Sequence, residues 1–119
     1  MKNVYIMSAN RSAIGGFGGT LKGFCPVDLG TLVAKEAISR SGYDPKEIDH
    51  AVFGNVIHTE PRDMYVSRVI ALQSGLRKDS AALTVNRLCG SGLQAIISAI
   101  QVLALEDASI TMAGGVEVM

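Results

Sequence analysis

The sequence contains no tryptophan and only three tyrosines and three phenylalanines, so it offers little surface on which bases could stack. It also lacks an excess of charge of either sign, because eleven basic residues balance eleven acidic ones. No basic run is present that could follow a phosphate backbone. These shortages argue against nucleic acid as a partner.

Long hydrophobic runs are absent as well. The most apolar region, residues 93–105, is interrupted by three polar residues, whereas a membrane-spanning helix needs about 20 apolar residues. The apolar run at the N-terminus is too short for a signal peptide. The two cysteines, Cys25 and Cys89, make no disulfide framework, and no pair of residues has the spacing of metal ligands. We therefore expect a reduced, cytoplasmic protein with no membrane segment and no metal.

What is present is typical of an ordered globular protein: 119 residues, 48% of them hydrophobic and 18% charged, enough for one domain or part of one. Extended and helical patterns alternate along the chain and predict an α/β fold, a layered sheet of mostly parallel strands with flanking helices. The expected strands are residues 4–7, 51–57, 83–85 and 109–113. The expected helices are residues 28–41, residues 63–74, and a strong apolar stripe from Leu93 to Ala104.

Cys89 is the strongest candidate for a reactive group. It lies between the third predicted strand and the last predicted helix, in the run Asn86-Arg87-Leu88-Cys89-Gly90-Ser91-Gly92. A thiol at the start of a helix lies near the positive end of the helix dipole, which favours the nucleophilic thiolate. The small residues that follow leave space for a substrate carbonyl. The pattern therefore predicts covalent acyl transfer at the carboxyl edge of the sheet.

Other residues carry weaker signals. Cys25 has no activating neighbour in the sequence, so we expect a structural role. His50 and His58 could act as general bases, and His58 is the better candidate because it ends the second predicted strand. The glycine cluster of residues 15–19 matches neither a P-loop nor a dinucleotide fingerprint and is expected to be a flexible turn. A last set of charges is expected at the surface or at an interface around a helix start: Arg62, Asp63 and Arg68.

Four stretches of the chain, in order, resemble the thiolases, the family of acetyl-CoA acetyltransferases and β-ketothiolases. Residues 86–95 look like the family's nucleophile motif, and residues 11–15 are similar to its Arg-Thr-Ala-Ile/Val-Gly segment. Residues 54–56 match its second strand, and residues 114–119 resemble its Gly-Gly-x-Glu-x-Met stretch. The resemblance covers the whole chain, and several motifs in the right order are more specific than one alone.

The resemblance implies a thiolase-like layered fold, of which residues 1–119 would be an incomplete N-terminal domain without its last strand and helix. It implies that Cys89 takes an acyl group from acetyl-CoA or a 3-ketoacyl-CoA, and that its backbone N–H helps to form an oxyanion hole. Coenzyme A thioesters would be substrates, with no permanently bound cofactor. The complete enzyme would be a homotetramer or homodimer. The family's activating histidine, second catalytic cysteine and main coenzyme A loop lie beyond Met119.

Two alternatives stay open. A ketosynthase-like condensing enzyme would also use a cysteine nucleophile, and the chain could instead be a non-catalytic structural piece. Within the thiolases, residues 58–68 differ from the Gly-Gln-Asn-Pro-Ala-Arg type found in many acetoacetyl-CoA thiolases. They resemble a subgroup of β-ketothiolases with broader tolerance of chain length. We expect the chain alone to have little or no thiolase activity.

Overall fold

The computed structural model describes residues 3–119 and has three helices and three strands in an alternating order. A short 3-10 turn, η1 (Pro45–Glu47), follows the first helix, and a second one, η2 (Pro61–Tyr65), leads directly into the second helix. The main elements are α1 (Pro26–Ser41), β1 (His50–Gly54), α2 (Val66–Gln73), β2 (Ala81–Val85), α3 (Ser91–Ala104) and β3 (Thr111–Gly115).

The three strands form one parallel sheet in the order β2-β1-β3. Gly54, the last residue of β1, is in register with Val85 of β2 and Gly115 of β3. All three strands therefore end at the same edge of the sheet. This carboxyl edge is where the turn that carries Cys89 leaves β2.

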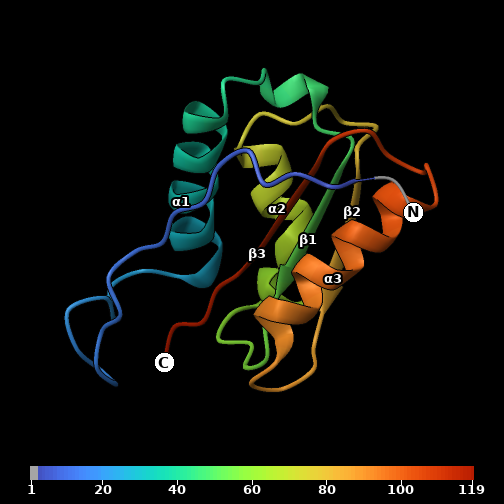
Figure 1. Cartoon of the computed structure of the whole chain (residues 1–119). Helices are drawn as coiled ribbons and strands as arrows, with labels where there is room; N and C mark the ends of the chain where they lie inside the picture. The colour runs from blue at the N-terminus through green and yellow to red at the C-terminus, as the bar shows by residue number, and fades with distance from the viewer. Residues whose placement is uncertain (1–2) are drawn as a thin grey trace.

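Helices cover both faces of the sheet, which gives three layers (Figure 1). On one face α1 and α2 bury the larger core, to which β1 contributes Ala51 and Phe53. On the other face α3 packs through Ala95 and Ala99 against Val52. Successive residues of β1 thus point to opposite layers, as the pleat of a strand requires. The predicted α/β class with parallel strands is confirmed.

Local signals explain where α1 begins and ends. Pro26 occupies its first turn, where a missing N–H costs nothing, and Asp28 places a negative charge near the positive end of the dipole. Gly42 ends the helix in the left-handed conformation, with φ of 78°. The predicted end at residue 41 is confirmed. The predicted helix over residues 63–74 begins instead as the 3-10 turn η2 and becomes α-helical at Val66.

The apolar stripe predicted for the last helix is not the face that lies on the sheet. Its buried face consists of the small residues Ser91, Ala95 and Ala99, while Leu93 is 66% exposed and Ile96 is 41% exposed. Small side chains allow the helix to approach the strands closely. The large side chains consequently point away from the sheet and leave an apolar outer surface.

The predicted strand over residues 4–7 is wrong. Residues 3–16 have no regular secondary structure, and Tyr5 and Ile6 are 74% and 79% exposed. The segment runs along α1 instead, where Ser8 donates a hydrogen bond to the Ala37 carbonyl at 2.7 Å and Asn10 donates one to the Val33 carbonyl at 3.1 Å (Figure 1). A strand needs a neighbouring ladder for its backbone groups, and a helix surface offers none.

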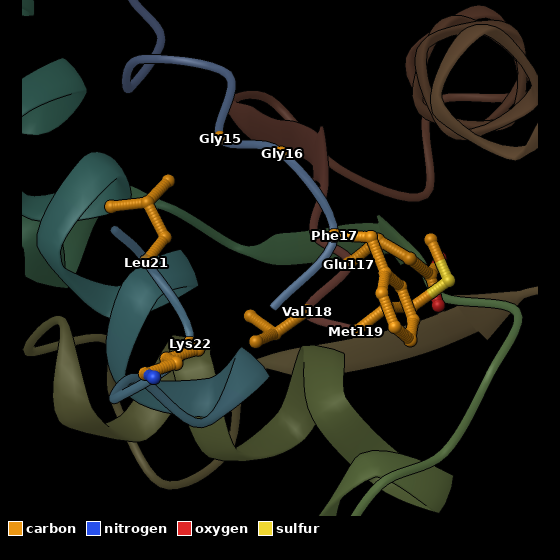
Figure 2. A pocket seen from close by; sticks show the side chains of 8 residues that line it. All are labelled: Gly15, Gly16, Phe17, Leu21, Lys22, Glu117, Val118 and Met119. Atoms are coloured by element: carbon orange, nitrogen blue, oxygen red, sulfur yellow. The ribbon is translucent and has the colours of Figure 1, made fainter. Parts of the chain in front are cut away.

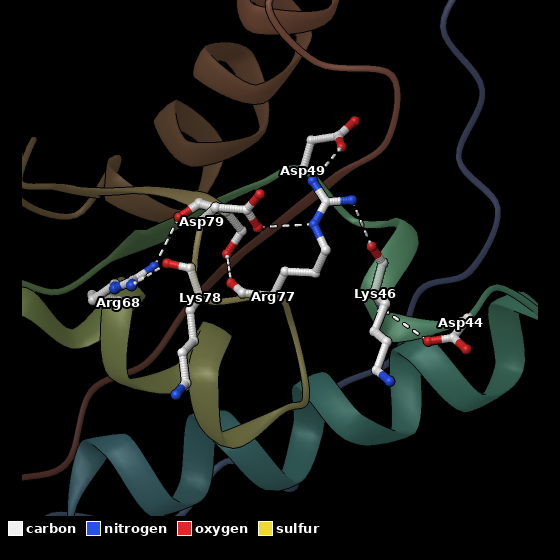
Figure 3. A network of polar contacts seen from close by, with 8 residues as sticks. Asp44, Lys46, Asp49, Arg68, Arg77, Lys78 and Asp79 are labelled. Atoms are coloured by element: carbon white, nitrogen blue, oxygen red, sulfur yellow. Dashed lines mark hydrogen bonds and ion pairs between the residues drawn. The ribbon is translucent and has the colours of Figure 1, made fainter.

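A polar network joins the loops at the amino edge of the sheet, opposite to Cys89 (Figure 3). The Asp49 carboxylate accepts hydrogen bonds from the backbone N–H groups of Ser109 at 2.8 Å and Ile110 at 3.3 Å. Arg77 donates to the Asp79 carboxylate at 2.9 Å and lies 3.8 Å from Asp49. These contacts tie together the segments that lead into the three strands. Within residues 3–119 no helix is long and apolar enough to cross a membrane.

Candidate active site

The turn between β2 and α3 brings Cys89 to the carboxyl edge of the sheet, as its sequence position predicts. Cys89 is exposed and directly precedes Gly90, the residue that caps α3. None of the hydrogen bonds within residues 3–119 involves its thiol. The sulfur is therefore accessible to a reaction partner.

The backbone of this turn is strained at Leu88. Leu88 has φ of 50°, in the left-handed region, and its side chain is 70% exposed. For a leucine this conformation costs about 1–2 kcal/mol, so neighbouring contacts must hold it. Asn86 Oδ1 accepts a hydrogen bond from the Leu88 N–H at 3.1 Å, and the Leu88 carbonyl accepts one from Ser91 Oγ at 2.6 Å. Strain of this kind gathers at functional sites.

The end of β1 fixes where α3 begins. A Cβ added to Gly54 would lie 2.8 Å from the Ser91 carbonyl carbon, which no real side chain tolerates. A Cβ on Gly115 would lie 3.4 Å from the Gly92 Cα. The end of β1 must therefore be glycine for α3 to start this close to the sheet, whereas a Cβ on Gly115 would make an ordinary contact. This close approach determines where Cys89 is held.

A hollow of about 620 Å³ opens beside Cys89 at the carboxyl edge. Its walls come from the ends of β1 and β3, the Cys89 turn, and the last residues of the chain. The lining is mostly apolar: Val56, Ile57, Leu88, Val116 and Met119, with glycines between them and Glu117 as the charged member. Such a surface suits an apolar acyl group next to the thiol.

Glu117 and Asn55 connect the segments that follow β1 and β3. The Glu117 carboxylate accepts hydrogen bonds from the backbone N–H groups of Ile57 at 2.7 Å and Val56 at 3.1 Å. Asn55 is fully buried and donates to the Val116 carbonyl at 2.9 Å. These bonds fix one wall of the hollow, and the Glu117 carboxylate uses its oxygens to accept them.

Cys25 differs from Cys89 in its surroundings. It is partly buried at the start of α1, and the Arg62 guanidinium lies 3.7 Å from its sulfur. Burial raises the pKa of the Cys25 thiol, and the hydrogen bond and negative charge of Asp28 raise it further. The environment of Cys25 thus favours the unreactive thiol, in line with the structural role expected for it.

The structure does not bring either histidine to Cys89. His50 starts β1 at the amino edge, where its Nε2 is buried without a partner among the described residues. His58 is exposed four residues beyond β1 and makes no hydrogen bond within residues 3–119. Across that same range no cluster of three His, Cys, Asp or Glu side chains could hold a metal ion.

Asp63 is a correction to the sequence interpretation, which placed it among surface charges. It is fully buried, and its Oδ2 accepts hydrogen bonds from the backbone N–H groups of Thr59 at 2.8 Å and Glu60 at 3.0 Å. It therefore caps η2 from within. Arg68 donates hydrogen bonds to the carbonyl groups of Lys78 and Ser80, so it is not only a solvated surface charge.

The glycine cluster lines a smaller hollow of about 130 Å³ (Figure 2). Its wall includes Phe17, Leu21 and Lys22 and residues 117–119, and in Figure 2 the Phe17 ring lies beside Glu117 and Met119. The Gly18 N–H donates to the Met119 carbonyl at 3.2 Å. This contact orders the loop against the end of the chain. The loop is a turn, as expected, and it supports the residues that border the larger hollow.

The sequence interpretation missed the residues that shape the Cys89 turn. Asn86, two residues before Leu88, is a signal for an Asx-turn, in which the side chain bonds to the backbone two residues on. Serine, the residue at position 91, often forms hydrogen bonds with nearby backbone groups. Polar residues directly after two parallel strands, Asn55 and Glu117, lie where such sheets build their sites. Each signal is present in the sequence, but it identifies these residues as part of the Cys89 site only once the register of the strands is known.

Comparisons with known proteins agree with one another. The family model of the thiolase N-terminal domain matches residues 4–119. The chain is 52% identical over 118 residues to the β-ketothiolase BktB of Cupriavidus necator, covering 99% of this chain and 30% of that protein. It is 36% identical to the human mitochondrial 3-ketoacyl-CoA thiolase over all of its length, again covering 30% of the relative.

Solved structures give the same result. The human mitochondrial 3-ketoacyl-CoA thiolase in complex with CoA superposes with a TM-score of 0.87 at 36% identity, covering 90% of this chain and 27% of that one. A thiolase from Ascaris suum in complex with coenzyme A gives 0.90 at 37% identity, covering 96% and 30%. The chain therefore spans about 30% of the length of its curated relatives. By sequence and by fold, this chain belongs to the thiolase family and corresponds to its N-terminal domain.

Proposed function

We propose that this chain provides the nucleophile of a thiolase-type acyltransferase and that Cys89 is that nucleophile. The observation that carries the proposal is the position of Cys89: an exposed thiol at the start of α3, in a strained turn beside an apolar hollow. The relatives' names supply the reaction class, since they include β-ketothiolase and acetyl-CoA acetyltransferase. Coenzyme A thioesters are the proposed substrates, and two solved relatives contain CoA.

In thiolysis, the Cys89 thiolate would attack the 3-keto carbon of a 3-ketoacyl-CoA. The bond between the 2- and 3-carbons breaks, and its electron pair leaves as the enolate of acetyl-CoA, which takes up a proton. The shortened acyl group remains on Cys89 as a thioester. The thiolate of free CoA then attacks this thioester and regenerates Cys89. In the condensation direction the same steps run in reverse.

The chain's own residues account for part of this chemistry. The hollow beside Cys89 binds the acyl chain, and the backbone N–H of Cys89 is the proposed donor to the oxyanion. The proton transfers need an acid and a base near the sulfur. His50 and His58 do not meet this need, so we propose that other parts of the complete enzyme supply these groups.

Substrate range, assembly and location are further proposals. We propose a tolerance for longer acyl groups, because the hollow is wide and apolar and residues 58–68 resemble the broader β-ketothiolases. The complete enzyme is proposed to be a homotetramer or homodimer acting in fatty acid metabolism. The cytoplasmic location stays a prediction from the sequence. The family match gives the ketosynthase-like alternative no support.

The test is thiolysis by the complete natural polypeptide that contains these residues. Acetoacetyl-CoA and a longer 3-ketoacyl-CoA serve as substrates, and free CoA as the acyl acceptor. We expect turnover of both, and a loss of at least about 1,000-fold in Cys89→Ala, as is usual when a covalent nucleophile is removed. Cys25→Ala is the matched control and should keep its activity. Turnover that survives Cys89→Ala would contradict the proposal.

A further inference from the structure

The Cys89 turn depends on a side chain that the reaction itself does not use. Ser91, the first residue of α3, is 5% exposed and lies against the end of β1. Its Oγ accepts a hydrogen bond from the Arg87 N–H at 2.8 Å and donates one to the Leu88 carbonyl at 2.6 Å. The hydroxyl of a residue that follows Cys89 thus bonds to two consecutive residues that precede it, Arg87 and Leu88.

These bonds differ from ordinary helix capping. A serine near a helix start usually accepts from the N–H groups of the following turn, whereas Ser91 bonds backward to the residues before the helix. A serine within a helix commonly donates to a carbonyl three or four residues earlier, but it need not accept a backbone N–H at the same time. The Ser91 hydroxyl does both. This double use matches the need to hold Leu88 in a left-handed conformation.

We propose that Ser91 is a positioning residue for Cys89. Its buried hydroxyl holds Leu88 at positive φ, and this conformation points Cys89 from the start of α3 into the apolar hollow. Without the hydroxyl, the turn keeps its backbone hydrogen bonds from the Gly90 N–H to the Arg87 carbonyl at 3.1 Å and from the Ser91 N–H to the Leu88 carbonyl at 3.0 Å. It loses the two bonds that fix Leu88 from the side chain, so Leu88 can leave the left-handed conformation and the thiol moves away from the hollow. Ser91 also lines the hollow, but its hydroxyl bonds to the backbone of Arg87 and Leu88 and not to the Cys89 thiol, so it acts on the sulfur through the turn.

The inference rests on the proposed role of Cys89, but its test does not require acyl transfer. Iodoacetamide is the probe, and peptide mapping by mass spectrometry gives the alkylation rates of Cys89 and Cys25 in the same sample of the full chain. Cys25 is the internal reference, because it lies away from this turn at the start of α1. Failure of thiolysis would leave this ratio measurable, so the two proposals can fail separately.

Three variants define the experiment. Ser91→Ala removes the hydroxyl, and Ser91→Thr keeps it. Ser98→Ala removes a different α3 hydroxyl, which accepts from Gln94 at 3.1 Å and within residues 3–119 makes no hydrogen bond to the backbone of the turn; its one link to the turn there is through the side chains of Gln94 and Arg87. We expect the ratio of Cys89 to Cys25 alkylation to fall about tenfold in Ser91→Ala, the effect of losing roughly two hydrogen bonds. Ser91→Thr should recover it, and Ser98→Ala should leave it unchanged.

Hydrogen exchange gives a second readout. The Arg87 amide should exchange faster in Ser91→Ala and remain protected in Ser91→Thr. If Ser91→Ala does not fold by circular dichroism, Asn86→Ala replaces it, since Asn86 is exposed and holds Leu88 from the other side. That variant should lower the ratio as well. An unchanged ratio in the folded variant, an equal fall in Ser98→Ala, or no recovery in Ser91→Thr would each overturn the proposal.

Discussion

Single charged residues at the amino edge of the sheet make the stability of this protein depend on pH. The hydrogen bond from Arg77 and its positive charge lower the pKa of the Asp79 carboxyl. In the unfolded chain this pKa returns to about 3.9. The folded-state pKa is thus the lower of the two. The stabilisation by Asp79 is therefore present above the unfolded pKa and is lost as the pH falls through the folded one.

Asp79→Asn should accordingly weaken the dependence of unfolding on pH in the acidic range. Urea unfolding midpoints measured from neutral pH down to strongly acidic pH should fall less steeply below about pH 4 than in the parent chain. Asp107→Asn is the control, because Asp107 is exposed and makes no ion pair within residues 3–119. Identical pH profiles for Asp79→Asn and the parent would contradict this assignment.

At the same scale, the sequence distinguished the two cysteines but not the turn around Cys89. The glycines and the serine beside Cys89 indicate a reactive thiol, which stays a prediction, and Cys25 lacks any such context. The left-handed Leu88 was not predictable, because leucine disfavours that conformation and it is held by hydrogen bonds from Asn86 and Ser91 and by the Gly90 N–H bond to the Arg87 carbonyl. Tertiary contacts override local preference here.

At the scale of elements, the approach of α3 to the sheet depends on the glycine that ends β1. Gly54→Ala would place a Cβ against the backbone of Ser91, which cannot move aside without shifting the helix. We expect a loss of about 1–3 kcal/mol in the free energy of unfolding, the usual range for overpacking. Urea titration with an unchanged m-value would measure it.

Gly92→Ala is the matched control on the other side of this contact. A Cβ there meets no atom within 4 Å, and alanine favours the helix. Its stability should be unchanged or higher by up to about 1 kcal/mol. Equal destabilisation by the two substitutions would show that close approach at Gly54 does not fix the helix.

The patterns of the sequence were sufficient to predict where β1, β2, β3 and the three helices lie, with the first part of the predicted helix 63–74 forming η2. For α3 the pattern gave the helix but not the face that packs on the sheet. It failed where burial depends on a neighbour. Residues 4–7 have the composition of a strand, yet they lie along α1 without a ladder to join. In α3 the large apolar residues form the outer surface, because the space next to the sheet admits only Ala95 and Ala99.

At the scale of the whole molecule, residues 3–119 leave the edges of the sheet and one helix face without a packing neighbour. The outer edges of β2 and β3 are unpaired within residues 3–119, and Leu93 and Ile96 expose apolar surface on α3. Neither histidine forms a hydrogen bond with Cys89 within residues 3–119, and we propose that the acid and the base come from other parts of the complete enzyme.

We therefore predict that the 119-residue chain alone does not turn over acetoacetyl-CoA in the presence of CoA. The assay follows loss of acetoacetyl-CoA, with the complete polypeptide as positive control. Sustained turnover by the chain alone that disappears in Cys89→Ser would contradict this prediction, because it would mean that these residues suffice for proton transfer.

The most direct test of the account is whether Cys89 becomes acylated. The complete polypeptide is mixed with acetyl-CoA, quenched in acid and digested, and the peptides that carry Cys89 and Cys25 are weighed by mass spectrometry. The account predicts an acetyl group on the Cys89 peptide that is removed by added CoA, and no acetyl group on the Cys25 peptide. An unmodified Cys89 alongside an acetyl group on another residue would contradict it.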